Sequence, residues 1–336
     1  MESTFRALWA QTPSGDTNDH AQIQCEIRET QLDELTSGDV VIQVEYSGIN
    51  YKDALAVTGK GKILRALPLI PGIDMSGTVI QSRSTLWKEG DRVLLNGRQL
   101  GEKLTGGYSE RVRLPGDLPV RIPHGLSSRE AMIMGTAGFT AALAICQLEK
   151  NELRPAKGPV LVTGATGGVG SLAIAMLNQL GYETEAWTRR PEHQAWIESC
   201  GASKVTVTNE KDWTTRPLES VVWASAIDNV GGKILEHIVP RIDLWGSVAS
   251  IGMASDHQLS TTVFPFILRG VNILGVSSNN GPEKLRHSLW ERLASDLKPK
   301  NLDSICEKEI TLDQLPQECQ RVVKGQHRGR TLVKVS

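Results

Sequence analysis

In the N-terminal third of the chain, apolar and polar positions alternate in short runs that predict β-strands. The runs cover residues 39–46, 75–80, 91–95 and 110–114. Turn signals separate them, among them Pro71-Gly72 and the glycines at positions 97, 101, 106 and 107. Such spacing is typical of a small β-rich domain with irregular loops.

From residue 127 onward the pattern changes to alternating helices and strands. Residues 127–148 form a long helical window, for which Ser127 or Ser128 is a suitable N-cap. Further strands are expected at 159–162, 183–188, 205–208, 220–225, 246–251 and 271–276, and helices at 170–180, 191–200, 233–238 and 262–269. This alternation predicts a doubly wound parallel sheet, hence an α/β protein.

The chain returns to mixed character near its C-terminus and ends in an expected strand at 331–335. With 336 residues it is long enough for two domains. We therefore expect one domain at 1–130, to which 300–336 return, and a second domain at 131–299.

The charges are balanced, with 37 Lys plus Arg against 38 Asp plus Glu and a formal net charge of −1. This balance argues against a broadly basic protein that binds nucleic acid. Hydrophobic residues make up 40% of the chain, so it has enough apolar side chains to bury a core and does not have the composition of a disordered protein.

The five cysteines are dispersed, and no two of them have CxxC spacing. This favours a reducing compartment and argues against a disulfide scaffold or a cysteine-built zinc site. The first ten residues lack the apolar run of a signal peptide, and no stretch has the ~18 uninterrupted apolar residues that span a bilayer. We expect a soluble, cytoplasmic protein that does not act at a membrane.

The sharpest local signal is a glycine-rich turn between an expected strand and an apolar helix. The sequence Val160-Leu161-Val162-Thr163-Gly164-Ala165-Thr166-Gly167-Gly168-Val169-Gly170 covers both the strand end and the helix start. Small residues there let the backbone approach a pyrophosphate, and the free N–H groups of the first helical turn attract its charge. The alternative is a tight strand–helix turn that binds nothing.

The second strand of this domain ends in basic rather than acidic residues. In sheets that bind NAD, an acidic residue about 20 positions after the glycines bonds the ribose hydroxyl. Here the strand ends Trp187-Thr188-Arg189-Arg190. Two guanidiniums suit a 2′-phosphate, so we expect NADP (NADPH); the alternative is a solvated arginine pair.

Several motifs together resemble the medium-chain dehydrogenase/reductase superfamily, in its zinc-free quinone-oxidoreductase-like branch and the acrylyl-CoA reductase family. They are residues 50–62 (NYKDALAVTGKGK), 71–74 (PGID), 135–141 (GTAGFTA), 165–170 (ATGGVG), 265–269 (PFILR) and 329–335 (GRTLVKV). The resemblance implies a GroES-like catalytic domain and a Rossmann domain that binds NADPH. It further implies reduction of an activated C=C bond, such as that of acrylyl-CoA.

Many members of the superfamily hold a catalytic zinc ion, and the resemblance shows which residues occupy those positions here. The first-loop cysteine of such relatives falls on Asn50, and the histidine of their Gly-His-Glu turn falls on Ile73. Isoleucine cannot bind a metal, and residues 95–115 contain no four-cysteine lobe. We expect no metal, and therefore a reaction that needs no strong Lewis acid.

The resemblance also implies roles for individual residues. Tyr51 is expected beside the nicotinamide at the domain cleft, either as the hydrogen-bond or proton donor of the reaction or as a packing residue, while Asp53 orders its loop. Thr166, Gly167, Gly168 and Val169 are expected at the pyrophosphate, and Thr188, Arg189 and Arg190 at the ribose phosphate. Met253, Ile267 and Ser278 match positions that line the nicotinamide half. Thr208 stands where relatives often have an arginine, so one cofactor contact is absent.

The substrate is less constrained than the cofactor. Lys60, Lys62 and Arg65 form a basic run that suits coenzyme A phosphates or is simply a solvated face. Arg98 stands in a loop where relatives often carry an aromatic residue, which leaves the substrate open between an enoyl thioester and a quinone or small enone. A third hypothesis is a nucleotide-binding protein without turnover. By analogy with the family, we expect a homodimer that pairs through the edge strand near 271–276.

Overall fold

The computed structural model describes residues 4–13, 22–209, 213 and 216–336, so the first three residues of the segment examined for a signal peptide lie outside the described residues. The chain divides into two compact units. Unit 1 comprises residues 1–136, 279–290 and 306–336, and unit 2 comprises residues 137–278 and 291–305. We describe each unit separately.

Unit 1 is built on β-sheets. A seven-stranded sheet has the order β14-β15-β3-β4-β5-β7, with β6 also paired to β3, and β1 and β2 form a separate two-stranded sheet. The bounds are β1 Phe5–Gln11, β2 Gln24–Thr30, β3 Val40–Ile49, β4 Asp74–Ser82, β5 Arg92–Asn96, β6 Arg111–Leu114, β7 Val120–Arg121, β14 Cys306–Ile310 and β15 Arg330–Lys334. The core of unit 1 lies among the buried apolar residues of these strands, for example Leu8, Ile42 and Val333.

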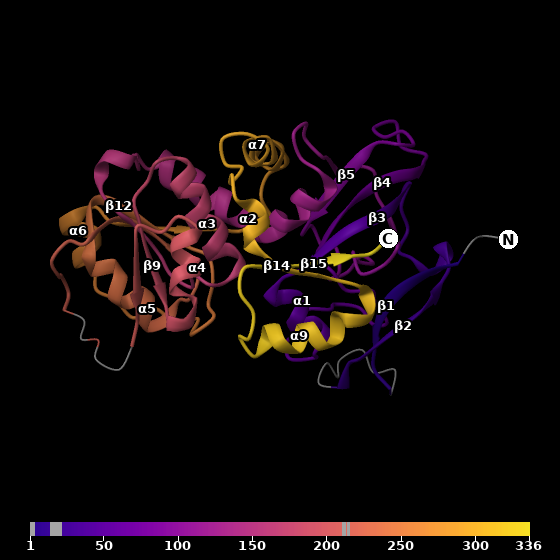
Figure 1. Cartoon of the computed structure of the whole chain (residues 1–336), viewed down its shortest axis with the longest axis horizontal. Coiled ribbons are helices and arrows are strands. Elements are labelled where there is room, and N and C mark those ends of the chain that lie inside the picture. The colour runs from indigo at the N-terminus through magenta and orange to yellow at the C-terminus, as the bar shows by residue number, and fades with distance from the viewer. Residues whose placement is uncertain (1–3, 14–21, 210–212, 214–215) are drawn as a thin grey trace. The chain divides into compact units, whose positions relative to one another are not determined.

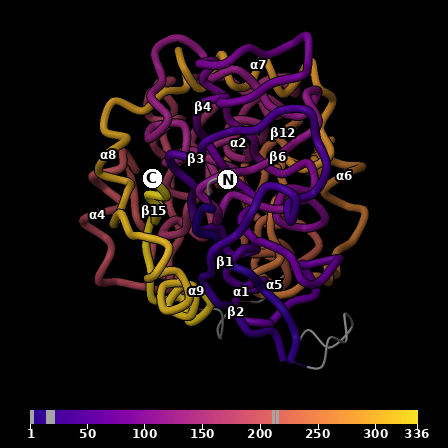
Figure 2. Tube along the Cα trace, turned by 90° about the vertical axis from the view of Figure 1, so that its right-hand side faces the viewer, coloured from indigo at the N-terminus to yellow at the C-terminus, as the bar shows by residue number. Residues whose placement is uncertain are grey.

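The C-terminal strand pairs with a strand from the first fifty residues. β15 lies antiparallel to β3, with Thr331 opposite Ile49, and Figure 2 shows the yellow C-terminal segment beside β3. Because Ile49 ends β3 and Tyr51 begins α1 (Tyr51–Val57), this pairing brings the C-terminal strand close to the start of α1. The sheet register therefore places residues nearly 300 positions apart at one site.

Short helices complete unit 1. They are α1, α9 (Leu315–Val323) and the 3₁₀ segments η2 (Leu32–Glu34) and η7 (Leu312–Gln314). α7 (Glu283–Leu293) starts in this unit, where Arg286 donates hydrogen bonds to the carbonyl oxygen and Oδ1 of Asn96 at 2.9 and 2.8 Å. Trp290 Nε1 donates to the same Oδ1 at 3.1 Å, so α7 is anchored to the end of β5.

Unit 2 contains a six-stranded sheet that is parallel throughout. Its order is β10-β9-β8-β11-β12-β13. The bounds are β8 Val160–Val162, β9 Thr184–Thr188, β10 Lys204–Val207, β11 Trp223–Asp228, β12 Ile242–Ser250 and β13 Asn272–Gly275. When these six strands are numbered 1 to 6 by their order along the chain, their order in the sheet is 3-2-1-4-5-6. This is the Rossmann arrangement, with its switch point between β8 and β11.

Helices cover both faces of the sheet in unit 2. α3 and α4 lie on one face and α5 and α6 on the other (Figure 1). The bounds are α3 Gly168–Gln179, α4 Gln194–Ser199, α5 Gly232–Ile238, α6 Phe264–Arg269 and α8 Leu302–Ile305, with 3₁₀ segments η3 Pro155–Lys157, η4 Pro191–His193 and η6 Val239–Arg241. Because both faces are covered, β8, β9 and β11 consist of buried residues only, as expected of a parallel sheet.

The long helix α2 (Ser128–Lys150) is apolar enough in length and composition to span a membrane, yet 83% of its most apolar window is buried inside the protein. It is therefore a core helix. Gly135 interrupts its helical geometry with φ 49° and ψ −149°, and the boundary between the two units follows Thr136.

The expected fold class is confirmed: a GroES-like β-rich unit and a doubly wound parallel sheet. The helix expected at 191–200 begins as the 3₁₀ segment η4 and continues as α4, and Pro191 suits its start because the first N–H groups of a helix have no intrahelical partner. The hydrophobic pattern missed the strands β1, β2, β7 and β14 and the helices α1, α7, α8 and α9. The strand predicted at 220–225 lies three residues later, at Trp223–Asp228.

Candidate active site

The glycine-rich turn of unit 2 joins β8 to α3 in a conformation that needs small residues. Gly164 has φ +60°, which favours glycine, and its carbonyl accepts a hydrogen bond from Gly167 N at 2.9 Å. A Cβ at Gly170 would lie 2.4 Å from the oxygen of Gly164, so only glycine allows this approach of helix and turn. The turn therefore requires glycine at both positions for steric reasons.

The start of α3 is suited to an anion. Its N-cap is Gly167, which has no side chain to cap the helix, and Gly168 and Val169 form the first turn. Backbone N–H groups at such a helix start carry the positive end of the helix dipole. The residues expected at a pyrophosphate thus lie at one helix terminus.

The end of β9 contacts this turn directly. Arg190 Nη2 donates a hydrogen bond to Thr166 Oγ1, and the backbone N–H of Arg190 donates to Thr188 Oγ1 at 3.0 Å. Thr208 N in turn donates to the carbonyl of Thr188 at 2.8 Å. The structure therefore brings Thr166, Thr188 and Arg190 together, while Arg189 is exposed to solvent beside them.

Polar residues that the sequence did not single out meet at the switch point between β8 and β11. Thr163 Oγ1 donates to Asp228 Oδ1 at 2.7 Å, and Asn229 Nδ2 donates to the carbonyl of Thr163 at 2.8 Å. Asp228 also accepts from Gly231 N at 2.8 Å, and burial raises its pKa. Ligands of open α/β sheets bind in the crevice at such a point.

The three residues expected around the nicotinamide half lie in different places. Met253 is 71% exposed in the loop after β12, at the same sheet edge as Thr163 and Asp228. Ser278 is half-buried. Ile267 is 74% exposed on α6, and Arg269 in the same helical turn donates to the carbonyls of Pro240 and Ile242 at the amino end of β12. Within this unit, Ile267 therefore lies apart from the glycine turn.

In unit 1, the backbone before Tyr51 is held by a capping box. Asp53 Oδ2 accepts hydrogen bonds from Asn50 N at 2.9 Å and Asn50 Nδ2 at 3.0 Å, and Asp53 Oδ1 accepts from Ile73 N at 2.8 Å. Tyr51 is the first residue of α1, and its side chain is 54% exposed. The expected ordering role of Asp53 therefore has a geometric basis.

A second buried carboxylate, Asp74, extends this network. It accepts from Asn50 Nδ2 at 2.7 Å, from Thr136 N at 2.9 Å and from Thr136 Oγ1 at 2.6 Å. Arg330 lies 3.8 Å away, measured from its Nη2 to Asp74 Oδ2. Both side chains are almost completely buried.

The network changes the acidity of Asp53. Burial, together with the nearby charge of Asp74, raises the pKa of Asp53 to about 7, against the lowering effect of the hydrogen bonds from Asn50 and Ile73. Asn50 Nδ2 donates to both carboxyl groups, so Asp53 and Asp74 lie close enough for a charge on Asp74 to oppose the ionisation of Asp53.

The basic run expected to hold coenzyme A phosphates is exposed, as its three members Lys60, Lys62 and Arg65 all reach solvent. Arg65 N donates to the carbonyl of Glu102 at 2.7 Å, which joins this loop to the neighbouring loop that contains Lys103. Arg98, which lies in the same neighbouring loop as Glu102 and Lys103, is half-buried.

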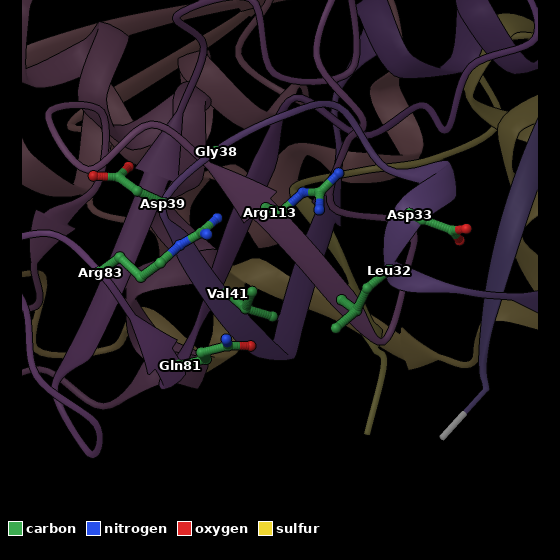
Figure 3. Close-up of a pocket in the computed structure, with 8 residues that line it drawn as sticks. All are labelled: Leu32, Asp33, Gly38, Asp39, Val41, Gln81, Arg83 and Arg113. Atoms are coloured by element: carbon green, nitrogen blue, oxygen red, sulfur yellow. The ribbon is translucent and has the colours of Figure 1, made fainter. Parts of the chain in front are cut away.

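A hollow elsewhere in unit 1 is remote from Tyr51. Its volume is about 170 Å³, and it is lined by residues around the start of β3, including Asp39, Arg83 and Arg113 (Figure 3). At about 3.3 Å per residue, the start of β3 lies roughly 30 Å along the strand from Asn50. The hollow therefore does not belong to this network.

Sequence reasoning missed Asp74, Thr136 and Arg330 as site residues, although each stands in a stretch that carried the resemblance. The signal was present as polar side chains inside otherwise apolar segments: Asp74 begins β4, and Arg330 begins β15. What no local pattern indicates is that these segments converge on Asn50.

Comparison with known families assigns the chain to a class. Residues 36–124 match the alcohol dehydrogenase GroES-like domain, and residues 168–295 match the zinc-binding dehydrogenase domain. The chain belongs to the medium-chain dehydrogenase/reductase superfamily, in the branch that contains the acrylyl-CoA reductases and YhfP.

Individual relatives cover nearly the whole chain. The AcuI protein of Escherichia coli is 47% identical over 91% of this chain and 94% of its own length, and the acrylyl-CoA reductase AcuI of Ruegeria pomeroyi is 44% identical over 93% and 95%. YhfP of Bacillus subtilis, which is named as a quinone oxidoreductase, is 42% identical over the full length of both chains.

Solved structures of two relatives contain a dinucleotide. The YhdH oxidoreductase of Salmonella enterica, in complex with NADP, has 42% identity and a TM-score of 0.93 over 98% of this chain and 100% of its own. The structure of YhfP with NAD bound has 42% identity and a TM-score of 0.94 over 99% of each chain.

The residues at the metal position of the zinc relatives do not fit a zinc ion. Ile73 is apolar and buried, and the amide of Asn50 is engaged with Asp53 and Asp74. Within the described ranges no group of three or more His, Cys, Asp or Glu side chains is arranged to hold a metal. Zinc is bound by thiolates, imidazoles and carboxylates, and the carboxylates present here, Asp53 and Asp74, already accept hydrogen bonds from Asn50 and Thr136, so this set suits hydrogen bonding instead.

The raised pKa of Asp53 predicts a pH-dependent stability that Asp53→Asn removes. The native carboxyl keeps its proton up to about pH 7, whereas the unfolded chain loses it near pH 4. The stabilisation is therefore complete below about pH 4 and is lost as the pH rises to about 7. Urea unfolding between pH 4 and 8 should show the wild type losing stability relative to Asp53→Asn. Parallel curves for the two proteins would contradict the assignment.

Proposed function

We propose that the chain is an NADPH-dependent oxidoreductase that reduces the activated C=C bond of a 2-enoyl thioester such as acrylyl-CoA, without zinc. The observation that carries this proposal is the hydrogen-bonded network of Asn50, Asp53, Asp74 and Arg330 at the position where zinc relatives bind their metal. In this proposal unit 2 holds the dinucleotide and unit 1 carries the catalytic residues. As functional domains we propose 131–299 and 1–130 with 300–336; the compact units differ from this division in that 131–136 and 279–290 belong to unit 1 and 300–305 to unit 2.

The proposed reaction needs a hydride and a proton. When bound, NADPH supplies the hydride, which forms a C–H bond at the β-carbon of the substrate. The electron pair of the C=C bond then moves toward the thioester oxygen as an enolate, and the α-carbon takes up a proton to give the saturated thioester. Hydrogen bonds are sufficient to stabilise such an enolate, so no Lewis acid is needed.

Tyr51 is the proposed donor in unit 1. Its hydroxyl donates a hydrogen bond to the enolate oxygen or delivers the proton, and its exposure leaves it accessible to a substrate. The capping box formed by Asn50 and Asp53 fixes the backbone from which Tyr51 projects. A tyrosine is a suitable donor because its hydroxyl carries a proton that it donates in a hydrogen bond.

The proposed cofactor site lies in unit 2. Gly167, Gly168, Val169 and Thr166 bind the pyrophosphate through the start of α3, and Thr188, Arg189 and Arg190 bind the 2′-phosphate. The contact between Arg190 and Thr166 supports this arrangement because it holds a guanidinium beside the glycine turn. Met253 and Ser278 are proposed for the nicotinamide half; Ile267 is proposed there on the resemblance alone, because α6 contacts the amino end of β12.

The cofactor preference is tested by replacing Arg189 and Arg190 with alanine together. Charged hydrogen bonds of about 1.5–3 kcal/mol predict that NADPH binding weakens by about 10–150-fold, while the dissociation constant of NADH stays nearly unchanged. Both constants are measurable from the tryptophan fluorescence of the protein. Arg216→Ala, which removes an exposed arginine of the same unit, should change neither. Equal losses for the two cofactors would contradict the proposal.

A quinone is the second candidate substrate, because YhfP is similar to this chain over its full length. The basic loop separates the two candidates. If Lys60 and Lys62 bind coenzyme A phosphates, their removal weakens binding only of substrates that carry these phosphates, whereas a small quinone has none.

The substrate test uses the double variant Lys60→Ala, Lys62→Ala with NADPH and acrylyl-CoA. Loss of two solvated ion pairs predicts a KM about 3–10-fold higher for acrylyl-CoA and unchanged for the acrylyl thioester of N-acetylcysteamine. Lys88→Ala, another exposed lysine of unit 1, is the matched control. NADPH oxidation with a small quinone but not with acrylyl-CoA would overturn the thioester proposal.

We also propose a homodimer that works in the cytoplasm. β13 is an edge strand of the described sheet, and apolar side chains near it are exposed, including Trp245 at 71% and Leu268 at 57%. Such an edge with large exposed apolar residues is typical of an interface. All five cysteines are free, which suits a reducing compartment.

Sedimentation velocity tests the dimer. The wild type should sediment as a dimer at micromolar concentration, and Trp245→Asp should sediment as a monomer because it buries a charge in the interface. Leu86→Asp replaces a comparably exposed apolar residue in unit 1 and should leave the dimer intact. A monomeric wild type would contradict the proposal.

A further inference from the structure

We propose that Arg330, in the C-terminal strand, is a positioning residue that acts through Tyr51. It holds the backbone immediately before Tyr51 in the place where a metal ion anchors the same backbone in zinc relatives. The inference rests on the proposed role of Tyr51 in the reaction, and it assigns a function to the last strand of the chain.

The guanidinium of Arg330 clamps two segments of unit 1. Its Nη1 donates to the carbonyl of Ile49 at 3.0 Å and to Asn50 Oδ1 at 3.1 Å, and its Nε donates to the carbonyl of Ile133 at 2.9 Å. Ile49 and Asn50 directly precede Tyr51. The fork-shaped side chain therefore fixes the entry into α1 relative to the irregular turn in α2.

The clamp is relayed through one amide group. Arg330 fixes Asn50 Oδ1, and the Nδ2 of the same side chain donates to both Asp53 and Asp74. Because every polar atom of this amide has a partner, Asn50 has a single orientation. The capping box that starts α1 depends on that orientation.

The space around the Arg330 side chain is narrow and fits a planar guanidinium. A Cβ at Gly48 would lie 2.8 Å from Arg330 Nη2, and a Cβ at Gly135 would lie 3.1 Å from the same atom. Glycine at these two positions leaves the space that the guanidinium fills. The side chain of Arg330 is only 2% exposed, so this space is inside the protein.

Stability alone is a poor reason for such an arrangement. Among the residues that the structure describes, Nη2 has no hydrogen-bond partner, and it lies 3.8 Å from Asp74 Oδ2, beyond hydrogen-bonding distance. Buried ion pairs are often no more stabilising than well-packed apolar residues, and an unpaired buried donor is unfavourable. The network is better explained by the geometry that it imposes on Tyr51.

Tyr51 needs this external support. Because more than half of its surface is exposed, packing of its own side chain does not fix where its hydroxyl lies. Its position depends on the backbone of Asn50 and on the first turn of α1. An error of about 1 Å in the position of a reacting group can reduce the rate about 100-fold.

A double-mutant cycle tests the inference with the full-length protein, NADPH and acrylyl-CoA. The variants are Tyr51→Phe, Arg330→Gln and the two combined. We expect Arg330→Gln to lower kcat by about 10–100-fold without changing the dissociation constant of NADPH. In the Tyr51→Phe background the same substitution should lower kcat by less than about 2-fold, because the group that it positions is already absent.

Arg330→Lys guards against loss of folding, since it retains the buried charge. Lysine lacks the planar fork, so it should not restore kcat although thermal unfolding stays close to that of the wild type. Arg321→Gln removes another ion-paired arginine of unit 1 and should leave kcat unchanged.

The outcomes separate the inference from the function on which it rests. If the separate kcat losses of Tyr51→Phe and Arg330→Gln multiply in the double variant, the positioning role of Arg330 is overturned. Full wild-type kcat in Arg330→Lys overturns it as well. Neither result affects the proposed function. Absence of wild-type turnover of acrylyl-CoA overturns the proposed function, and full activity of Tyr51→Phe overturns the proposed role of Tyr51; either result removes this inference with it.

Discussion

The hydrogen bonds that converge on Asp74 connect most of unit 1. The carboxylate accepts from Asn50 at the end of β3 and from Thr136 in α2, and it faces Arg330 at the start of β15. A buried carboxylate requires such partners, because the cost of removing its charge from water is otherwise too high. The buried carboxylate of Asp74 must be paired with hydrogen-bond donors. Three features of unit 1 are compatible with this need: the sheet register, the irregular geometry at Gly135 and the start of α1.

The glycine turn of unit 2 differs from this network, because it leaves polar backbone groups open to a ligand instead of pairing them with side chains. Its helix start lacks a capping side chain at Gly167, which leaves N–H groups without the side-chain partner that usually stabilises a helix end. Glycine at the N-cap costs only about a few tenths of a kcal/mol relative to Ser, Thr, Asn or Asp, so this arrangement gives up little local stability. In exchange, the positive end of the helix dipole is available to a phosphate, and Arg190 lies close by through its contact with Thr166.

The side chains in the two units limit the reactions that this member of the superfamily can catalyse. The carboxylates of the network around Asp74 are engaged as hydrogen-bond acceptors, and they are joined by an amide and a guanidinium rather than by the thiolates and imidazoles of a zinc site, so this set orients groups and moves protons instead. Reduction of a conjugated C=C bond fits this set, because negative charge on an enolate is delocalised before protonation. The identity of 44% to the acrylyl-CoA reductase of Ruegeria pomeroyi agrees with that chemistry.

The sequence by itself determined the parallel sheet, the glycine turn and the basic end of β9, because each depends on local periodicity or on neighbours within one βαβ unit. It also identified Asn50 and Ile73 as poor zinc ligands, since the identity of a side chain limits what it can bind. Only the tertiary structure decided that Asp74 and Arg330 meet at Asn50 and that Thr136 bonds to Asp74. These contacts join positions up to 280 residues apart, and pairing of β15 with β3 is needed to bring them together.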